Sequence, residues 1–145
     1  MIVVDTNVLS EFMRTSPDPA VAHWLTAAPI DRLAITSISV MEISYGIARL
    51  PEGGRKDRTQ ATWNQLDGAW AGAYFDFSIA DALTSGEVMA ARSSAGRPMS
   101  IPDAQIAGVC LARGAALATR NIKDFEGLGI ELINPWEREC YTVLQ

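Results

Sequence analysis

Three acidic residues occupy positions where a carboxylate is expected to be drawn into the protein. Asp5 closes the apolar run from Ile2 to Asp5, which is typical of a strand covered on both faces. Glu42 lies in a segment that is apolar nearly all round, and Asp103 falls in the first turn of a later helix, on its inward side. A buried carboxylate must be paired, protonated or bound to a metal ion. These three residues are therefore the first candidates for chemistry.

Each of the three also has a purely structural interpretation. Asp5 could be the N-cap of the following helix, although Thr6 and Asn7 are available for capping. Glu42 could form an ion pair with Arg49 or another basic residue, because structural ion pairs also bury charge. The third acidic residue is favoured at a helix N-terminus whatever its role. The hypothesis of a shared site depends on the three occurring together.

A fourth carboxylate follows the predicted strand from Ala116 to Thr119. The next residues include Arg120, Asn121 and Asp124, which places an amide, a carboxylate and a phosphate-binding candidate at the same edge of the sheet. Asp124 could equally be a loop residue that caps its own turn. Arg120 is the better candidate for binding a phosphate group, because one guanidinium can form two hydrogen bonds to the oxygens of one phosphate.

The repulsion between such carboxylates indicates what else the site needs. Two unit charges ~4 Å apart repel by ~4 kcal/mol at an effective dielectric near 20. Converging carboxylates therefore require a cation, or some of them take up protons. Oxygen ligands alone select Mg²⁺ or Mn²⁺ rather than zinc, and Mg²⁺ keeps several waters beside one or two carboxylates and substrate phosphate. Such an ion can activate water toward a phosphodiester.

The elements that must position these residues alternate between strands and helices. Strands are predicted at Ile2 to Asp5, Leu33 to Thr36, Tyr74 to Phe77, Ala116 to Thr119 and Ile130 to Ile133. Helices are predicted after a cap at Thr6 or Asn7, at Pro17 to Ala27, from Ser37 or Ser39 to about Leu50, at Arg55 to Ala71, at Ser78 to Arg92, and from Pro102 to Gly114. Alternation of this kind predicts an α/β fold with a mainly parallel, five-stranded sheet covered by helices on both faces. Ligands of such sheets bind at the carboxyl ends of the strands, where the strand order reverses.

Length and composition fit one ordinary globular domain over residues 1–145. The hydrophobic fraction is 48%, and 17 acidic against 12 basic residues give a net charge of −5, which argues against binding nucleic acid through bulk positive charge. Cys110 and Cys140 form no disulfide framework. No signal peptide or membrane span is predicted. We expect a cytoplasmic protein without a membrane partner.

Five short motifs occur in order along nearly the whole chain: Asp5-Thr6-Asn7 after a strand, Ile38 to Glu42 at a helix start, Pro102-Asp103-Ala104, Ala118-Thr119-Arg120-Asn121, and Ile133-Asn134-Pro135-Trp136. In their residues, order and spacing they resemble the motifs of the PIN-domain ribonucleases, and in particular of the VapC/FitB-like toxins of bacterial toxin–antitoxin pairs. The resemblance implies a three-layer α/β/α PIN-like fold and an Mg²⁺-dependent endoribonuclease, with Mn²⁺ as a possible substitute. It also implies a cognate antitoxin that blocks the site, and a homodimer that can pair again within the toxin–antitoxin complex as a dimer of heterodimers.

The resemblance further implies roles for individual residues. Asp5 and Asp103 would be the principal metal ligands and Glu42 the third acidic residue. Many relatives carry Asp where this chain has Asn121, so either Asp124 takes the fourth acidic role or the site functions with three carboxylates. In this hypothesis a metal-activated water attacks RNA phosphorus, while Thr6 and Asn121 orient water or phosphate.

Two other classes of function stay open at the level of the sequence. One is a phosphate-handling α/β domain, either a phosphotransferase or a phospho-acceptor module that uses Asp76. Against the phosphotransferase, Asn7 stands where a haloacid-dehalogenase type of site needs a second Asp. The other is a catalytically inactive PIN-like protein that only binds an antitoxin.

Overall fold

The computed structural model describes residues 1–137, so Cys140 lies outside the described residues. The strands are β1 (Ile2–Val4), β2 (Leu33–Thr36), β3 (Ala73–Phe75), β4 (Ala116–Ala118) and β5 (Leu132–Ile133). The helices are α1 (Thr6–Phe12), α2 (Pro19–Ala27), α3 (Ser37–Ala48), α4 (Gly54–Ala69), α5 (Ile79–Ser94), α6 (Ile101–Arg113) and α7 (Ile122–Phe125), with a 3₁₀ turn, η1 (Ile30–Arg32), before β2. None of the helices in this part of the chain is long and apolar enough to cross a membrane.

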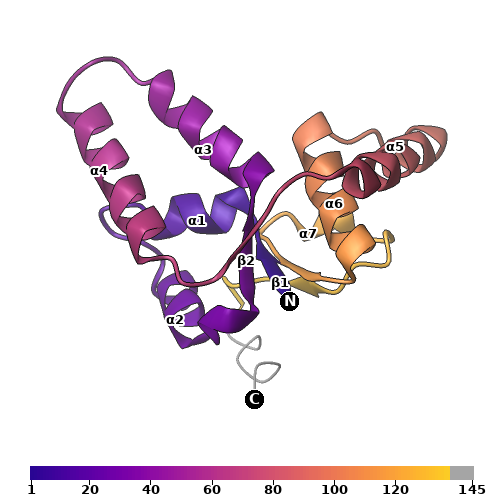
Figure 1. Ribbon diagram of the computed structural model, residues 1–145, viewed down its shortest axis with the longest axis horizontal. Coiled ribbons are helices and arrows are strands. Elements are labelled where there is room, and N and C mark those ends of the chain that lie inside the picture. Colours follow the sequence, from indigo (N-terminus) through magenta and orange to yellow (C-terminus); the bar gives the residue numbers. More distant parts are fainter. Residues whose placement is uncertain (138–145) are drawn as a thin grey trace.

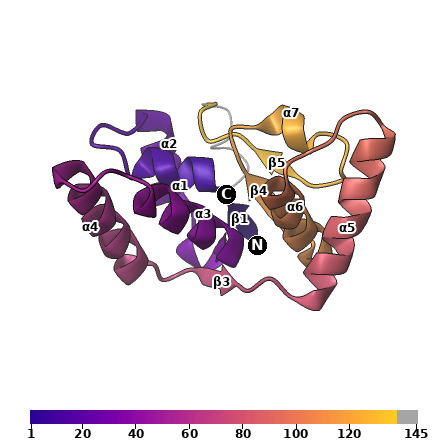
Figure 2. The ribbon, with the colours of Figure 1, turned by 90° about the horizontal axis from the view of Figure 1, so that it is seen from above.

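The five strands form one parallel sheet in the order β3-β2-β1-β4-β5. Helices α1 to α4 lie on one side of the sheet and α5 to α7 on the other, which gives the three-layer α/β/α arrangement (Figures 1 and 2). The chain builds outward from β1 to β3 on one side and then returns to add β4 and β5 on the other. The strand order therefore reverses beside β1, and this is where a ligand site is expected.

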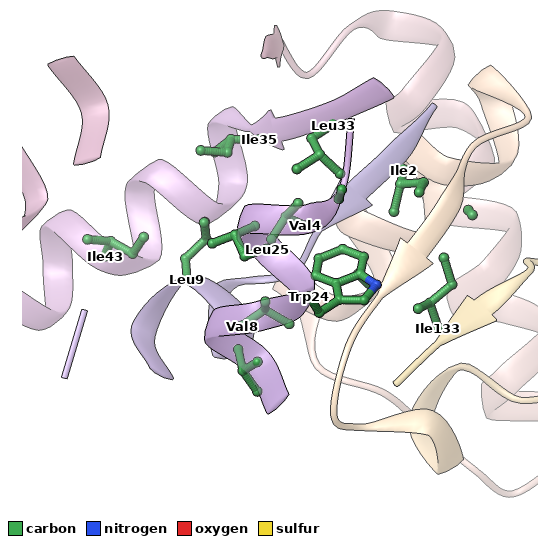
Figure 3. Packing of buried hydrophobic residues seen from close by; sticks show 14 of the residues in the cluster. Ile2, Val4, Val8, Leu9, Trp24, Leu25, Leu33, Ile35, Ile43 and Ile133 are labelled. Atoms are coloured by element: carbon green, nitrogen blue, oxygen red, sulfur yellow. The ribbon is translucent and has the colours of Figure 1, made fainter. Parts of the chain in front are cut away.

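The sheet is apolar on both faces because its strands alternate between two cores. Val3 packs under α5 and α6, whereas its neighbours Ile2 and Val4 pack under α1 to α3. Figure 3 shows the second of these cores, with Trp24 of α2 set against the strands. Residues from 2 to 4 are at most 3% exposed, as the uninterrupted apolar run predicted for a central parallel strand.

Polar residues at the strand ends begin several helices, though not always the residues expected. Asp5 is the N-cap of α1, where Thr6 or Asn7 had been expected, and its side chain accepts from the amide of Thr6. Thr36, rather than Ser37 or Ser39, caps α3 by accepting from Ser39. In both cases the last residue of the strand region already carries a capping oxygen, so the helix begins one residue earlier.

Other predicted features are confirmed, with shorter strands. The capping box of Ser78 and Asp81 is present at the start of α5. Gly114 ends α6 in the left-handed conformation with φ 59°, which favours glycine. Strand β3 ends at Phe75, before the predicted Phe77, and strand β5 begins at Leu132, after the predicted Ile130. Helix α7 was not predicted, because four residues after a strand carry too little periodic pattern.

Candidate active site

Asp5 stands at the point where the strand order reverses. It follows β1 directly, its amide donates to the carbonyl of Ala118 at 2.9 Å, and it is only 3% exposed. Strand β4 therefore brings Thr119 and the loop after it beside the carboxyl end of β1. The prediction that Asp5 lies at the carboxyl edge of the sheet is confirmed, and the residue also caps α1.

The two oxygens of the Asp5 carboxylate have different partners. Oδ2 accepts from the Asn7 side-chain amide and from the Thr119 hydroxyl, each at 2.7 Å. Oδ1 accepts from the Thr6 backbone amide, also at 2.7 Å. Oδ2 is thus held by two side chains, which fix the plane of the carboxylate. Oδ1 has a single donor and is the oxygen with more capacity for a further ligand.

A second layer of hydrogen bonds ties the loops after β1 and β4 together. The Asn7 amide also donates to the Thr119 hydroxyl at 3.1 Å, and the Asn7 carbonyl oxygen accepts from the Arg120 amide at 3.2 Å. Thr119 in turn accepts from the Asn121 amide at 3.0 Å. Sequence analysis missed the positioning roles of Asn7 and Thr119. The available signal was an amide and a hydroxyl next to strand ends that a parallel sheet can place side by side.

Glu42 reaches this site from α3. Its Oε2 accepts from the Thr6 hydroxyl at 2.6 Å, which joins α3 to the first turn of α1. The predicted alternative, an ion pair with Arg49, is absent among the described residues, and the Arg49 guanidinium lies 5.6 Å from the centre of the Tyr45 ring. The expectation that α3 is buried all round is wrong, because Tyr45 is 65% exposed. Glu42 itself is half-buried at the rim of the site.

Asp103 approaches from the first turn of α6. Its Oδ2 accepts from the Ser100 hydroxyl at 2.7 Å, and Ser100 in turn accepts from the Asp103 amide at 3.2 Å. Ser100 is the N-cap of α6, so Asp103 also stabilises the helix start in the manner of its structural interpretation. It is half-buried, and Oδ2 is the oxygen bound by Ser100.

The electrostatics show that Glu42 and Asp103 act on the same carboxyl group. Burial raises the pKa of Asp5 from 3.8 to about 6, against hydrogen bonds from Thr119 and Thr6 that lower it. The negative charges of Asp103 and Glu42 both raise this pKa further. Three acidic residues separated by up to 98 positions in the chain thus influence the ionisation of one carboxyl group.

This environment fits a divalent cation that is held loosely by protein. Over residues 1–137, no three His, Cys, Asp or Glu side chains converge closely enough to form a ready-made cage. The available ligands are the carboxylate oxygens of Asp5, Glu42 and Asp103, and the charges of the last two raise the pKa of Asp5. Mg²⁺ commonly binds through one or two carboxylates and keeps its remaining positions for water and phosphate. The donor set therefore suits Mg²⁺ better than a closed structural site.

The other predicted residues line a hollow formed by the loop that follows β4. This hollow has a volume of about 670 Å³, and Arg120, Asn121 and Asp124 are among its lining residues. All three are exposed. Asp124 is not among the groups that perturb Asp5, and the Arg120 guanidinium lies 5.2 Å from the centre of the Trp136 ring. The structure therefore brings Asp5, Glu42 and Asp103 together and leaves Asp124, Asn121 and Arg120 beside them.

Comparison with known sequences gives a consistent result. A family model described as "PIN domain" matches residues 2–129. "VapC ribonuclease Y4jK" from Sinorhizobium fredii (strain NBRC 101917 / NGR234) is 37% identical over 141 residues, covering 94% of this chain and 99% of that protein.

Solved structures agree with the fold and the extent of the match. The crystal structure of FitAcB from Neisseria gonorrhoeae has a chain that is 26% identical, with a TM-score of 0.83 over 94% of this chain and 99% of that chain. A toxin–antitoxin complex from Klebsiella pneumoniae gives a TM-score of 0.71 at 25% identity, over 94% and 99% of the two chains. The family match, the strand order and the carboxylates at the edge of the sheet agree: this chain belongs to the PIN-domain family.

Proposed function

We propose that this protein is an Mg²⁺-dependent endoribonuclease that serves as the toxin of a toxin–antitoxin pair. The observation that carries the proposal is the effect of Glu42 and Asp103 on the buried carboxyl of Asp5 at the edge of the sheet. The 37% identity to a VapC ribonuclease over 94% of the chain supports RNA as the substrate.

The chain's own residues supply positioning. Asp5, Glu42 and Asp103 would hold the ion, with Asp5 presenting Oδ1 because Oδ2 is bound by Asn7 and Thr119. When bound, Mg²⁺ lowers the pKa of a water and neutralises charge that develops on phosphate. The Thr6 hydroxyl donates to Glu42 at 2.6 Å and so fixes the direction of that carboxylate.

Asn121 and Arg120 can assist at the rim of the site. Both follow Thr119, whose hydroxyl is bonded to Asp5, and both are exposed. In this proposal the Asn121 amide orients water or phosphate, and the Arg120 guanidinium binds a phosphate of the substrate. Asp124 lies in the same loop and would act on the site only through water.

The proposed protein partner is a cognate antitoxin, with a homodimer as the toxin's own assembly. The fold similarity to a chain of a toxin–antitoxin complex supports the antitoxin. A homodimer is supported by exposed apolar side chains one helical turn apart on α5, where Ile79 is 79% and Leu83 is 68% exposed. Pairing of two such units with antitoxin would give a dimer of heterodimers.

The proposal is tested by incubating purified protein with a labelled single-stranded RNA and Mg²⁺, Mn²⁺ or EDTA. We expect cleavage with either ion, none with EDTA, and a loss of at least about 100-fold in rate for Asp103→Asn and for Glu42→Gln, the scale of an acid–base or electrostatic contribution. Asp31→Asn is the matched control, because Asp31 lies in η1 at the opposite edge of the sheet and should cleave as the unaltered protein does.

Two results would overturn the proposal. Cleavage that persists in EDTA, or in the Asp103→Asn and Glu42→Gln variants, would remove the metal site. Complete absence of cleavage together with a stable antitoxin complex would favour an inactive binding protein. A mass increase of one phosphoryl group after treatment with a small phosphodonor would favour the phosphate-handling alternative.

A further inference from the structure

A large open hollow lies between α1, α3 and α4 and contains more positive than negative charge. Its volume is about 1000 Å³, and its lining residues come mainly from α1, α3 and α4 and from the residues just after α1, all on the same side of the sheet (Figure 1). Among residues 1–137, three arginines line it, namely Arg14, Arg55 and Arg58, and Glu42 is the one carboxylate. We call this hollow, with Arg14, Arg55, Arg58 and Glu42 in its lining, the basic hollow.

The cations of the basic hollow are largely available for a ligand. Arg55 and Arg58 are exposed, and neither belongs to any of the ion pairs found within residues 1–137. Arg14 pairs with Glu11 at 3.1 Å, and its side chain is 66% exposed. In a chain with a net charge of −5, two unpaired guanidinium groups lining one hollow indicate an anionic ligand.

The start of α4 adds to this positive potential. Its N-cap is Gly53, which provides no side-chain hydrogen bond to the helix, so the first amides of a 16-residue helix lack a capping side chain. The positive end of the helix dipole lies there, and Arg55 and Arg58 are the second and fifth residues of the helix. Asp57 is in the first turn, but it is not among the residues that line the hollow.

The basic hollow is connected to the candidate active site through Glu42. Glu42 lines the hollow and accepts from the Thr6 hydroxyl at 2.6 Å, and the Thr6 backbone amide donates to Oδ1 of Asp5 at 2.7 Å. Glu42 therefore belongs both to the lining of the hollow and to the group of three carboxylates. This continuity links the hollow to the substrate of the carboxylate site.

We propose that the basic hollow binds the sugar–phosphate backbone of a single-stranded RNA substrate, beside the bond that is cut. The proposal rests on the nuclease function proposed above. A polyanionic strand approaching three carboxylates on an acidic protein needs local positive charge to offset the repulsion. Guanidinium groups bind phosphate oxygens in pairs, and the neutral Thr62 and Gln65 in the same lining can hydrogen-bond to sugar hydroxyls.

The test measures binding of a fluorescein-labelled single-stranded oligoribonucleotide to the full chain in EDTA, which removes divalent ions and so prevents cleavage of the RNA during the measurement. The double variant Arg55→Ala/Arg58→Ala should bind more weakly, and the slope of log affinity against log salt should fall by about 1.4, the value for two phosphate contacts on a single strand. Between 50 and 200 mM salt the unaltered protein should therefore lose about sevenfold more affinity than the double variant. Arg55→Lys/Arg58→Lys should restore most of the slope because it keeps both charges.

Arg32→Ala is the matched control, because Arg32 is an exposed arginine of η1 at the opposite edge of the sheet, and it should change neither affinity nor slope. Thermal unfolding of every variant checks that the fold is intact. An unchanged slope in the double variant would overturn the proposal, as would an equal loss in Arg32→Ala or a loss of antitoxin binding with RNA binding intact. Normal RNA binding that depends on Arg55 and Arg58, without cleavage under any condition, would support the hollow and reject the proposed nuclease.

Discussion

The hydroxyl of Thr119 donates a 2.7 Å hydrogen bond to Oδ2 of Asp5, although 114 positions separate the two residues. Both side chains are buried, and their strands β1 and β4 are neighbours at the point where the strand order reverses. The bond fixes the carboxylate and lowers its pKa, in opposition to the burial that raises it. The orientation of the central acidic group therefore depends on a residue that carries no charge.

Replacement of Thr119 by Val tests this dependence. The variant keeps the shape of the side chain but removes the donor, so the pKa of Asp5 should rise above about 6. The loss of a hydrogen bond to a buried charged group should lower the free energy of unfolding at neutral pH by about 1–3 kcal/mol. The acid limb of the pH–rate profile should move to higher pH. Thr119→Ser should restore both properties, and an acid limb that stays in place in Thr119→Val would contradict the role of the hydroxyl.

The stability of the metal-free protein should depend on the proton of Asp5. The pKa of this carboxyl is about 6 in the folded protein and 3.8 in its ordinary state. Between these values the folded protein binds more protons than the unfolded one, so its stability should fall as the pH rises. The full effect is about 3 kcal/mol. The Asp5→Asn variant has no carboxyl group to titrate at this position. The difference between its free energy of unfolding in urea and that of the unaltered protein should therefore change between pH 4 and pH 6.5. A constant difference would mean that Asp5 is not perturbed.

The ion pair of Asp81 and Arg113 should make the opposite contribution. Burial acts to raise the pKa of Asp81, but hydrogen bonds from Ser78 and the charge of Arg113 at 2.9 Å lower it overall. Stability from this group is present above its ordinary pKa and is lost as the pH falls. Asp81→Asn should lower the unfolding free energy at pH 7 by about 2 kcal/mol, because it weakens both the capping box and the buried pair. The loss should shrink at pH 3, and a loss that is independent of pH would contradict the ion pair.

The contact between α5 and α6 should be sensitive to one added methyl group. A Cβ on Gly108 would lie 2.0 Å from the Ser85 hydroxyl and 2.7 Å from the Asp81 carbonyl. Gly108→Ala should therefore force the helices apart, lower the melting temperature and lower the free energy of unfolding by about 1–3 kcal/mol. Adding Ser85→Ala should recover only part of the loss, because the contact with the backbone carbonyl remains. Full recovery, or no loss at all, would show that the helices adjust freely.

The fold could be predicted largely from the sequence because its signals are local. The apolar run ending at Asp5 predicts a central strand, and the box of Ser78 and Asp81 predicts the start of α5; both are confirmed. The end of β3 was predicted at Phe77 and lies at Phe75, and the four-residue helix α7 was not predicted. Their boundaries depend on pairing with distant strands and on contacts such as Arg92 with the carbonyl of Glu126.

The candidate site could be predicted in its charges but not in its geometry. Acidic residues at strand ends and helix starts indicated Asp5, Glu42 and Asp103, because a parallel sheet gathers these positions at one edge. The Thr6–Glu42 bond and the hydrogen bonds of Asn7 and Thr119 to Asp5 were not predicted, since a neutral hydroxyl or amide has no charge signature in a sequence. The separation of Arg120, Asn121 and Asp124 from the three carboxylates depends on the path of the loop after β4, which sequence patterns do not specify.

The titration of the Asp5 carboxyl by ¹³C NMR tests the shared anionic site most directly. In metal-free protein we predict a pKa of about 6, which falls in Asp103→Asn and in Glu42→Gln because each removes a negative neighbour, and which falls further when Mg²⁺ is added to the unaltered protein. A pKa near 3.8 that responds to neither the two substitutions nor Mg²⁺ would contradict the account.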